Sequence, residues 1–462
     1  MSKKLAIGVT AAAVVVVAGA LGTSYYMGGK LQDEFTNGIS KLDKSGVTAK
    51  VSSYERGLFS STAKTVWTFG GGEEPVQITA DHKISHGPLP MGHAAEIHTA
   101  FSLPADADAE LKTALNGRAP VEVVTKVGWS RSTSNLMTSP AVVAKVKDSE
   151  MNWGGMKIEW DMPADMKAAK GTANFAGLAF KDEEGSTAMD KASMRFDIKQ
   201  PKDQQFWVGP FAMVVDKLTA TRVDEDGKSS SSSYEGLSMD SETTLKEDMV
   251  EMSLKGSLKS AKLEDGKADD LALDMVLRNI DAAWLNHFME MAKRKTAAEG
   301  DDEDMGSDFR ETLLKTVTQA LARHPAIDIK RVAMRTPEGL SEFGASLQYL
   351  GDGENMSNLT KDVKVSLNAN LPKPVLDSFM QSRKRKGILA MMDDDEPNMK
   401  EVDEAAKVSA QESLETLKEQ GIFEEKAGMM STQIVYANGA FQVNGKTLGD
   451  DGAAVLMGEA LE

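Results

Sequence analysis

The segment Met156-Lys157-Ile158-Glu159-Trp160-Asp161-Met162 alternates apolar and charged residues without interruption. Successive side chains of a strand point to opposite faces, so this pattern predicts a strand with one buried face and one wet face. The same period of two recurs at 194–199 and 363–368, and nearly so at 121–127 and 327–330. Strands of this kind are typical of antiparallel sheets that are covered on one side.

Turn signals separate these runs. Asn438-Gly439 and Asn444-Gly445 near the C-terminus fit tight hairpin turns, because both positions of such turns need a positive φ. The serine run from Ser229 to Ser233 fits either a flexible loop or an exposed edge strand.

Helical patterns are few and lie mainly in the second half. Asp281 is placed to cap a helix that carries Trp284 and Leu285. Further helices are predicted from Ser307 or Asp308 to His324, from Pro374 to Lys386, and from Asp403 to Gln420. The sequence therefore predicts an α+β protein that is mainly β: a large curved antiparallel sheet, or sheets, with a few packing helices.

Composition excludes several classes of function. The chain has 462 residues, a formal charge of 53 − 70 = −17, six histidines and no cysteine. Without cysteine there are no disulfides, thiol nucleophiles or cysteine-ligated metal sites. The acidic balance argues against nucleic-acid binding, which needs a basic face to displace counterions from phosphates.

The N-terminus carries a run without charge from Leu5 to Leu21, which extends to Met27 and follows Lys3 and Lys4. A transmembrane helix takes about 20 apolar residues, and flanking lysines favour the cytoplasmic side. The alternative is a cleaved signal peptide, since Ala18-Gly19-Ala20 resembles a cleavage site.

We therefore expect four regions along the chain, with the bulk of the protein in the periplasm. They are a cytoplasmic tail at 1–4, a single-pass inner-membrane anchor at 5–27, a β-rich periplasmic region at 28–280, and an α+β periplasmic region at 281–462.

Two motifs lie in order after this N-terminal run. Tyr54-x-Arg56-Gly57-x-Phe59-x-Ser61 comes first, and His86-Gly87-Pro88 follows it. With the C-terminal Asn-Gly pairs, this order resembles the YdgA/YihF-like family of Gram-negative envelope proteins, which is described as a domain of unknown function. The resemblance implies an inner-membrane anchor and a periplasmic body, and it implies no reaction and no catalytic residues.

Four of the six histidines lie within 17 residues: His82, His86, His93 and His98. His82 and His86 share one face of a strand, and Glu96 and His98 share one face of the next. Converging across a hairpin, His82, His86, His98 and Glu96 would form a zinc or copper site. The structural alternative is that these are polar positions on half-buried strands.

No nucleophile elbow, phosphate-binding loop or dense metal motif appears, so we expect no catalytic residues and no cofactor. The basic runs 293–295 and 383–386 fall at the ends of predicted helices, where cations complement the dipole; docking on anionic headgroups is the alternative. One-sided strands and 27 methionines favour an apolar sheet groove.

The leading hypothesis is a non-catalytic envelope scaffold or binding protein that holds lipid or another apolar ligand in such a groove. Two alternatives remain open. The first is an interaction module that self-associates, as a homodimer, along exposed sheet edges. The second is a histidine-metal hydrolase.

Overall fold

The computed structural model describes residues 47–57, 60–69, 76–86, 93–104, 106–146, 148–224, 226–263, 266–297, 317–318, 320–353, 361–391 and 398–449. The chain divides into two compact units. Unit 1 comprises Met1–Lys202 and Gly209–Ser238, and unit 2 comprises Asp203–Val208 and Met239–Glu462. The boundary falls inside β15 (Ser229–Lys246), which begins at the serine run and makes that run part of a strand.

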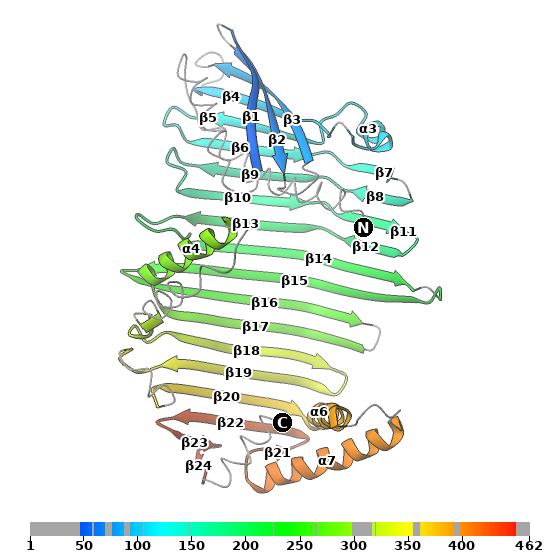
Figure 1. The fold of residues 1–462 in the computed structure, drawn as a ribbon, viewed down its shortest axis with the longest axis vertical. Coiled ribbons are helices and arrows are strands. Elements are labelled where there is room, and N and C mark those ends of the chain that lie inside the picture. Colours follow the sequence, from blue (N-terminus) through cyan, green and yellow to red (C-terminus); the bar gives the residue numbers. More distant parts are fainter. Residues whose placement is uncertain are drawn as a thin grey trace. The chain divides into compact units, whose positions relative to one another are not determined.

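Unit 1 is an antiparallel sheet (Figure 1). Its strands are β1 (Val47–Arg56), β2 (Ser60–Phe69), β3 (Val76–His86), β4 (Ala95–Phe101), β5 (Val121–Val127), β6 (Thr133–Ser139), β7 (Val142–Val146), β8 (Ser149–Trp153), β9 (Met156–Met162), β10 (Ala168–Phe175), β11 (Leu178–Asp182), β12 (Gly185–Met189), β13 (Ala192–Lys199) and β14 (Gly209–Val223). The ladder runs β1-β2-β3-β4-β5-β6-β9-β10-β13-β14. A shorter ladder, β7-β8-β11-β12, joins the far half of β14.

Strands β6 to β13 are halves of longer strands that break at one level of the sheet. Pro140 separates β6 from β7, and the Gly154-Gly155 pair separates β8 from β9. Gly155 has φ +93°, and a Cβ there would lie 2.8 Å from the carbonyl oxygen of Ser139. Gly177, with φ +135°, breaks β10 from β11. Aligned glycines therefore let the sheet crease without side-chain clashes.

Unit 2 contains a second antiparallel ladder. Its strands are β16 (Met249–Leu263), β17 (Gly266–Asp281), β18 (Ala326–Thr336), β19 (Gly339–Tyr349), β20 (Val363–Pro372), β21 (Glu424–Lys426), β22 (Met429–Ala437), β23 (Ala440–Val443) and β24 (Lys446–Thr447). The order is β16-β17-β18-β19-β20-β22, and β22 also pairs with β21 and β23. Strand β17, which ends at Asp281, pairs through Arg278 with β18, so both strands belong to unit 2.

The helices are α3 (Ala109–Leu115) in unit 1 and α4 (Ala282–Ala297), α6 (Lys373–Met391) and α7 (Met399–Glu419) in unit 2. Asp281 caps α4 as predicted, since its Oδ1 accepts from the backbone N–H of Trp284 at 2.9 Å. Helix α3 was not predicted; it packs Leu115 against Val142 and Ala144 of β7. Most of the helix predicted from 307 to 324 lies outside the described residues.

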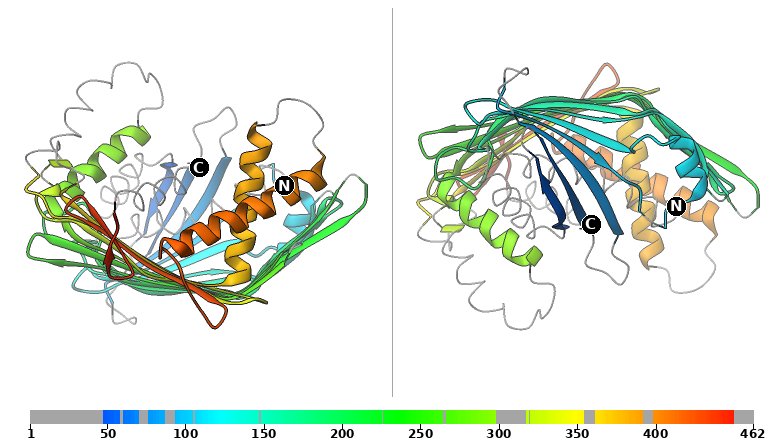
Figure 2. Two further views of the ribbon diagram at one scale, coloured as in Figure 1. Left: turned by 90° about the horizontal axis from the view of Figure 1, so that it is seen from below. Right: turned by 90° about the horizontal axis from the view of Figure 1, so that it is seen from above.

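In unit 2, α6 and α7 pack on one face of the sheet. Leu376 and Met380 of α6 meet Ala410 and Leu414 of α7 over Met430 of β22. Figure 2 shows the two helices crossing on that side. At the β16–β17 end, Leu285 of α4 is buried against Val250 with Ile280 and Met252 packed around it.

The predicted fold class is confirmed at the level of a mainly β chain with a few helices and an antiparallel sheet. The predicted anchor at 5–27 lies outside the described residues. Among the residues that are described, no helix is long and apolar enough to cross a bilayer.

Candidate functional site

His82 lies on the buried face of β3 and is 4% exposed. Its Nε2 is 2.8 Å from the Thr65 hydroxyl, and its Nδ1 is 2.9 Å from the Thr99 hydroxyl. The indole N–H of Trp67 donates to the same Thr65 oxygen at 2.8 Å. A neutral imidazole fits this chain, with Nε2 accepting from Thr65 and Nδ1–H donating to Thr99. Both ring nitrogens are thus occupied by hydroxyl groups.

Burial lowers the pKa of His82 to about 4, with a smaller opposing effect from the Asp81 carboxylate. Desolvation disfavours the imidazolium ion, and the nearest partners are hydroxyls rather than carboxylates. His82 is therefore an uncharged structural group at neutral pH.

Glu96 and His98 lie on the other face of the sheet. The β3–β4 register places His82 opposite Thr99 and Lys83 opposite His98. His98 Nε2 is 2.6 Å from one Glu96 oxygen, and His93 Nε2 is 3.3 Å from the other. The hydrogen bond from His98 holds the pKa of Glu96 below its usual value.

Of the four residues expected to bind a metal, His82 does not converge with Glu96 and His98. His82 is on the opposite face from Glu96 and His98, and His86 pairs with Ala95 at the end of β3, with a side chain outside the described part. Within the described ranges, no group of three His, Asp or Glu side chains is arranged to hold a metal ion. The strand register therefore separates His82 from Glu96 and His98.

The first family motif forms the β1–β2 hairpin. Tyr54 packs against the core, Arg56 pairs with Ser61 in the ladder, and Ser61 is buried. The N–H of Gly57 donates to the Ser60 carbonyl at 2.8 Å, and a Cβ on Gly57 would lie 2.5 Å from that oxygen. Phe59, Gly87 and Pro88 fall outside the described residues. What the structure describes of this motif is the paired ends of β1 and β2 and the hydrogen bond between Gly57 and Ser60.

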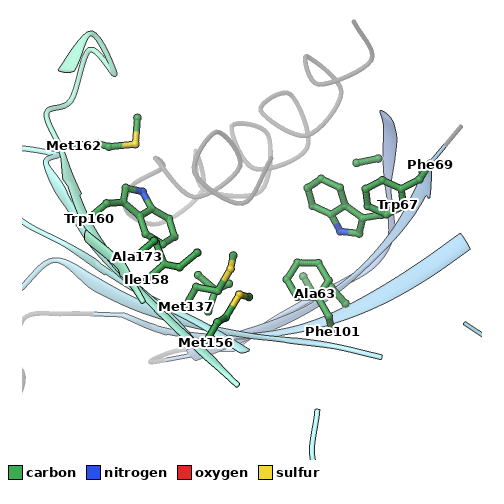
Figure 3. Close-up of a cluster of buried hydrophobic side chains, with 13 residues drawn as sticks. Ala63, Trp67, Phe69, Phe101, Met137, Met156, Ile158, Trp160, Met162 and Ala173 are labelled. Carbon is green, nitrogen blue, oxygen red and sulfur yellow. The ribbon is translucent and has the colours of Figure 1, made fainter. Parts of the chain in front are cut away.

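The apolar face of unit 1 is buried. Figure 3 shows Trp67, Phe101, Ile158 and Trp160 among the side chains on the concave side of curved strands. Trp67, Phe101, Ile158 and Trp160 are each 2–4% exposed. These side chains form a hydrophobic core.

One sheet face of unit 2 differs from the buried face of unit 1, and from here on "the apolar face" means this face of unit 2. Two rows of mostly aliphatic side chains cross its strands from β16 to β22. The first row is Met252, Leu277, Ile327, Leu347, Val365 and Tyr436. The second row is Leu254, Met275, Ile329, Ala345, Leu367 and Ile434.

A bulge in β18 keeps this face continuous. The register shifts between Ile329 and Val332, so that Ile329 pairs with Met275 while Val332 pairs with Leu273. An extra residue in one strand restores the alternation after the shift. Val332 thereby joins the same face, where it is 38% exposed.

The opposite face of this sheet is polar. Asp328 pairs with Arg278, and the hydroxyls of Ser346 and Ser366 lie 2.6 Å apart. The two faces are therefore chemically distinct, as expected for an antiparallel sheet with one apolar face and one solvated face.

No helix in the described part of the chain packs over the middle of the apolar face. Ile327, Leu347 and Val365 are direct neighbours on β18, β19 and β20, and they are 42%, 43% and 36% exposed. Helix α4 packs near the β16–β17 end, and α6 and α7 pack near β22. Exposed aliphatic side chains that adjoin one another mark a binding surface more often than exposed aliphatic side chains that are scattered singly over a protein.

This face suits an apolar chain. Its backbone N–H and C=O groups are paired in the ladder, so it presents side chains of hydrocarbon with few hydrogen-bonding groups. Six strands about 4.8 Å apart make each row about 24 Å long. Helices pack over both ends of the rows, so the exposed middle on β18, β19 and β20 spans about 10 Å, which is enough to contact part of one lipid acyl chain.

Sequence reasoning noted the alternation at 327–330 and 363–368 but missed the neighbouring strands of the apolar face. The signal was present as Leu271-x-Leu273-x-Met275-x-Leu277 in β17. Alternation identifies an apolar face; it carries no information on what covers that face.

Comparison with protein families finds a match over nearly the whole chain. The family described as "Bacterial protein of unknown function (DUF945)" matches residues 1–449. The match agrees with the sequence resemblance at the level of a bacterial family without an assigned function. Neither the curated proteins nor the solved structures contain a match to the chain.

Proposed function

Because the chain belongs to the DUF945 family of bacterial proteins of unknown function, we propose a function from its own surface: a non-catalytic envelope protein that binds a lipid acyl chain on the apolar face of unit 2. The observation that carries the proposal is the exposed row of Ile327, Leu347 and Val365. An acyl chain would gain about 25 cal/mol for each Å² of apolar surface removed from water.

The proposed location follows from the N-terminal sequence. The uncharged run from Leu5 to Leu21, preceded by Lys3 and Lys4, supports a retained inner-membrane anchor with the bulk of the chain in the periplasm. An anchored protein would have membrane lipid within reach of its apolar face.

An acyl chain fits this face better than a peptide does. A peptide brings backbone groups that must be hydrogen-bonded when buried, and the face offers few side-chain partners for them. A second copy of the chain is the competing occupant of this face, and it would appear as the mass of a dimer in place of one chain with a lipid.

The test is native mass spectrometry of the full chain, released from detergent, for the wild type and for a Leu347→Gln/Val365→Thr variant. Lipid held by the N-terminal run is common to both proteins, so the difference between them reports the apolar face. We expect additional mass of one phospholipid on the wild type and its loss in the variant.

Equal lipid occupancy in the two proteins would refute the acyl-chain proposal. A wild-type dimer that becomes monomeric in the variant would instead assign the face to a second copy of the chain.

A further inference from the structure

The basic run Arg383-Lys384-Arg385-Lys386 lies inside α6. The sequence predicted that the helix ends at Lys386, where cations would complement the dipole. Helix α6 continues to Met391, so the run stands more than one turn before its end, and its last turn carries no basic residue. The dipole acts within the last turn, so it does not account for these cations.

Partners within the chain account for part of the run. Arg385 Nε lies 2.7 Å from Asp403 Oδ1 of α7, and Lys384 also interacts within the chain. Arg383 and Lys386 have no ion-pair partner in the part of the chain that the structure describes. Like charges three residues apart on a helix disfavour it, so this pair has a cost without a visible internal compensation.

Phe379 precedes this pair on the same side of α6. The spacing of 379, 383 and 386 is that of one helical stripe. The Phe379 side chain is 60% exposed, although α6 buries Leu376 and Met380 against α7 and the sheet. We call Phe379, Arg383 and Lys386 the α6 stripe.

We propose that the α6 stripe docks on a bilayer surface that carries anionic phospholipid headgroups. Charge complementarity favours an anionic bilayer surface, because Arg383 and Lys386 are two cations without a described ion-pair partner on a chain whose net charge is −17. A guanidinium and an ammonium bind phosphate oxygens, and an aromatic ring beside them enters the boundary between headgroups and acyl chains.

Docking is independent of the apolar face. In the α6 stripe Phe379 and Lys386 are exposed and Arg383 is half-buried, and the stripe needs no ligand on the sheet. Loss of acyl-chain binding would leave docking intact. Loss of docking would leave the phospholipid mass expected in the native mass spectrum unchanged.

The test uses the absence of cysteine from the chain, which allows one label at a chosen position. A fluorophore is attached at Ser382→Cys, beside the stripe, and in a second protein at Gln411→Cys, an exposed position on α7. Each full chain is reconstituted in vesicles that contain nitroxide-labelled acyl chains. One set is phosphatidylethanolamine with phosphatidylglycerol, and the other is phosphatidylcholine alone.

We expect stronger quenching at 382 than at 411 in the anionic vesicles and no difference in phosphatidylcholine. Each cation near an anionic surface strengthens binding about five-fold, so Arg383→Gln/Lys386→Gln weakens docking by about 25-fold and brings quenching at 382 down to that at 411. The matched Lys400→Gln/Lys407→Gln variant on α7 keeps the wild-type difference. An unchanged thermal midpoint confirms that each variant folds.

Equal quenching at 382 and 411 in anionic vesicles would overturn the proposal. Quenching at 382 that persists in the Arg383→Gln/Lys386→Gln variant, or that is as strong in phosphatidylcholine, would overturn it as well.

Discussion

Leu347 on β19 lies directly opposite Val365 on β20, and both side chains are more than one-third exposed on the face where a sheet normally buries its apolar residues. Cross-strand aliphatic neighbours stabilise a sheet by contact with each other, and burial by a second layer adds much more. No described element forms a second layer over the middle of this sheet, and both side chains keep exposed apolar surface.

Leu347→Gln with Val365→Thr is expected to change the free energy of unfolding by no more than about 0.5 kcal/mol per site, because exposed positions contribute little to stability. Chemical denaturation of both proteins checks this. A loss of several kcal/mol would mean that the face is buried in solution, which contradicts an open binding surface.

Acid should weaken unit 1 through His82. The pKa of His82 is about 4 in the folded chain and about 6.5 when unfolded, so the unfolded state takes up the proton first as the pH falls. The contribution of neutral His82 is fully present above about pH 6.5 and is lost progressively down to about pH 4. At pH 5 the expected loss is about 2 kcal/mol.

Urea unfolding at pH 7 and pH 5 measures this loss, with His82→Gln as the comparison. The variant has no group to protonate at this position, so its stability should fall less between the two pH values. An identical pH dependence in the two proteins would show that His82 does not control it.

Gly155→Ala should destabilise unit 1 by at least about 1–3 kcal/mol, because its φ of +93° strains any other residue and the new Cβ would lie 2.8 Å from the Ser139 oxygen. Gly387→Ala is the control. Gly387 lies in α6 with open space around a Cβ, so this change should stabilise by about 0.5–1 kcal/mol. If Gly155→Ala and Gly387→Ala moved the thermal midpoint in the same direction, the requirement for glycine at the break between β8 and β9 would be contradicted.

The N-terminal run should stay on the mature protein. We expect the intact mass of the membrane-extracted chain to include residues 5–27, and protease added to spheroplasts to digest the rest. A mature chain that begins at Leu21 would establish the cleaved signal peptide in place of the anchor.

Local structure could be predicted because it depends on neighbours in sequence. The alternation at 156–162 is strand β9 with a buried-exposed pattern, and Asn438 and Asn444 adopt φ of 53° and 50° before their glycines. Asp281 caps its helix for the same reason.

Register and coverage could not be predicted. His82 and His86 do share a strand parity, as do Glu96 and His98, but only the pairing of Lys83 with His98 reveals that the two parities face opposite sides. The opening of the apolar face depends on which helices reach it, and those contacts join segments far apart in the chain. The bulge in β18 between Ile329 and Val332 likewise has no signal in the alternation of the sequence.

The most direct test of the acyl-chain account places a photo-crosslinking amino acid at Leu347 of the full chain in growing cells, and at Gln348 as the control. Gln348 is the next residue on β19 and faces the polar side. The account predicts phospholipid adducts at 347 and none at 348. Adducts to a second copy of the chain at 347, or equal lipid adducts at both positions, would contradict it.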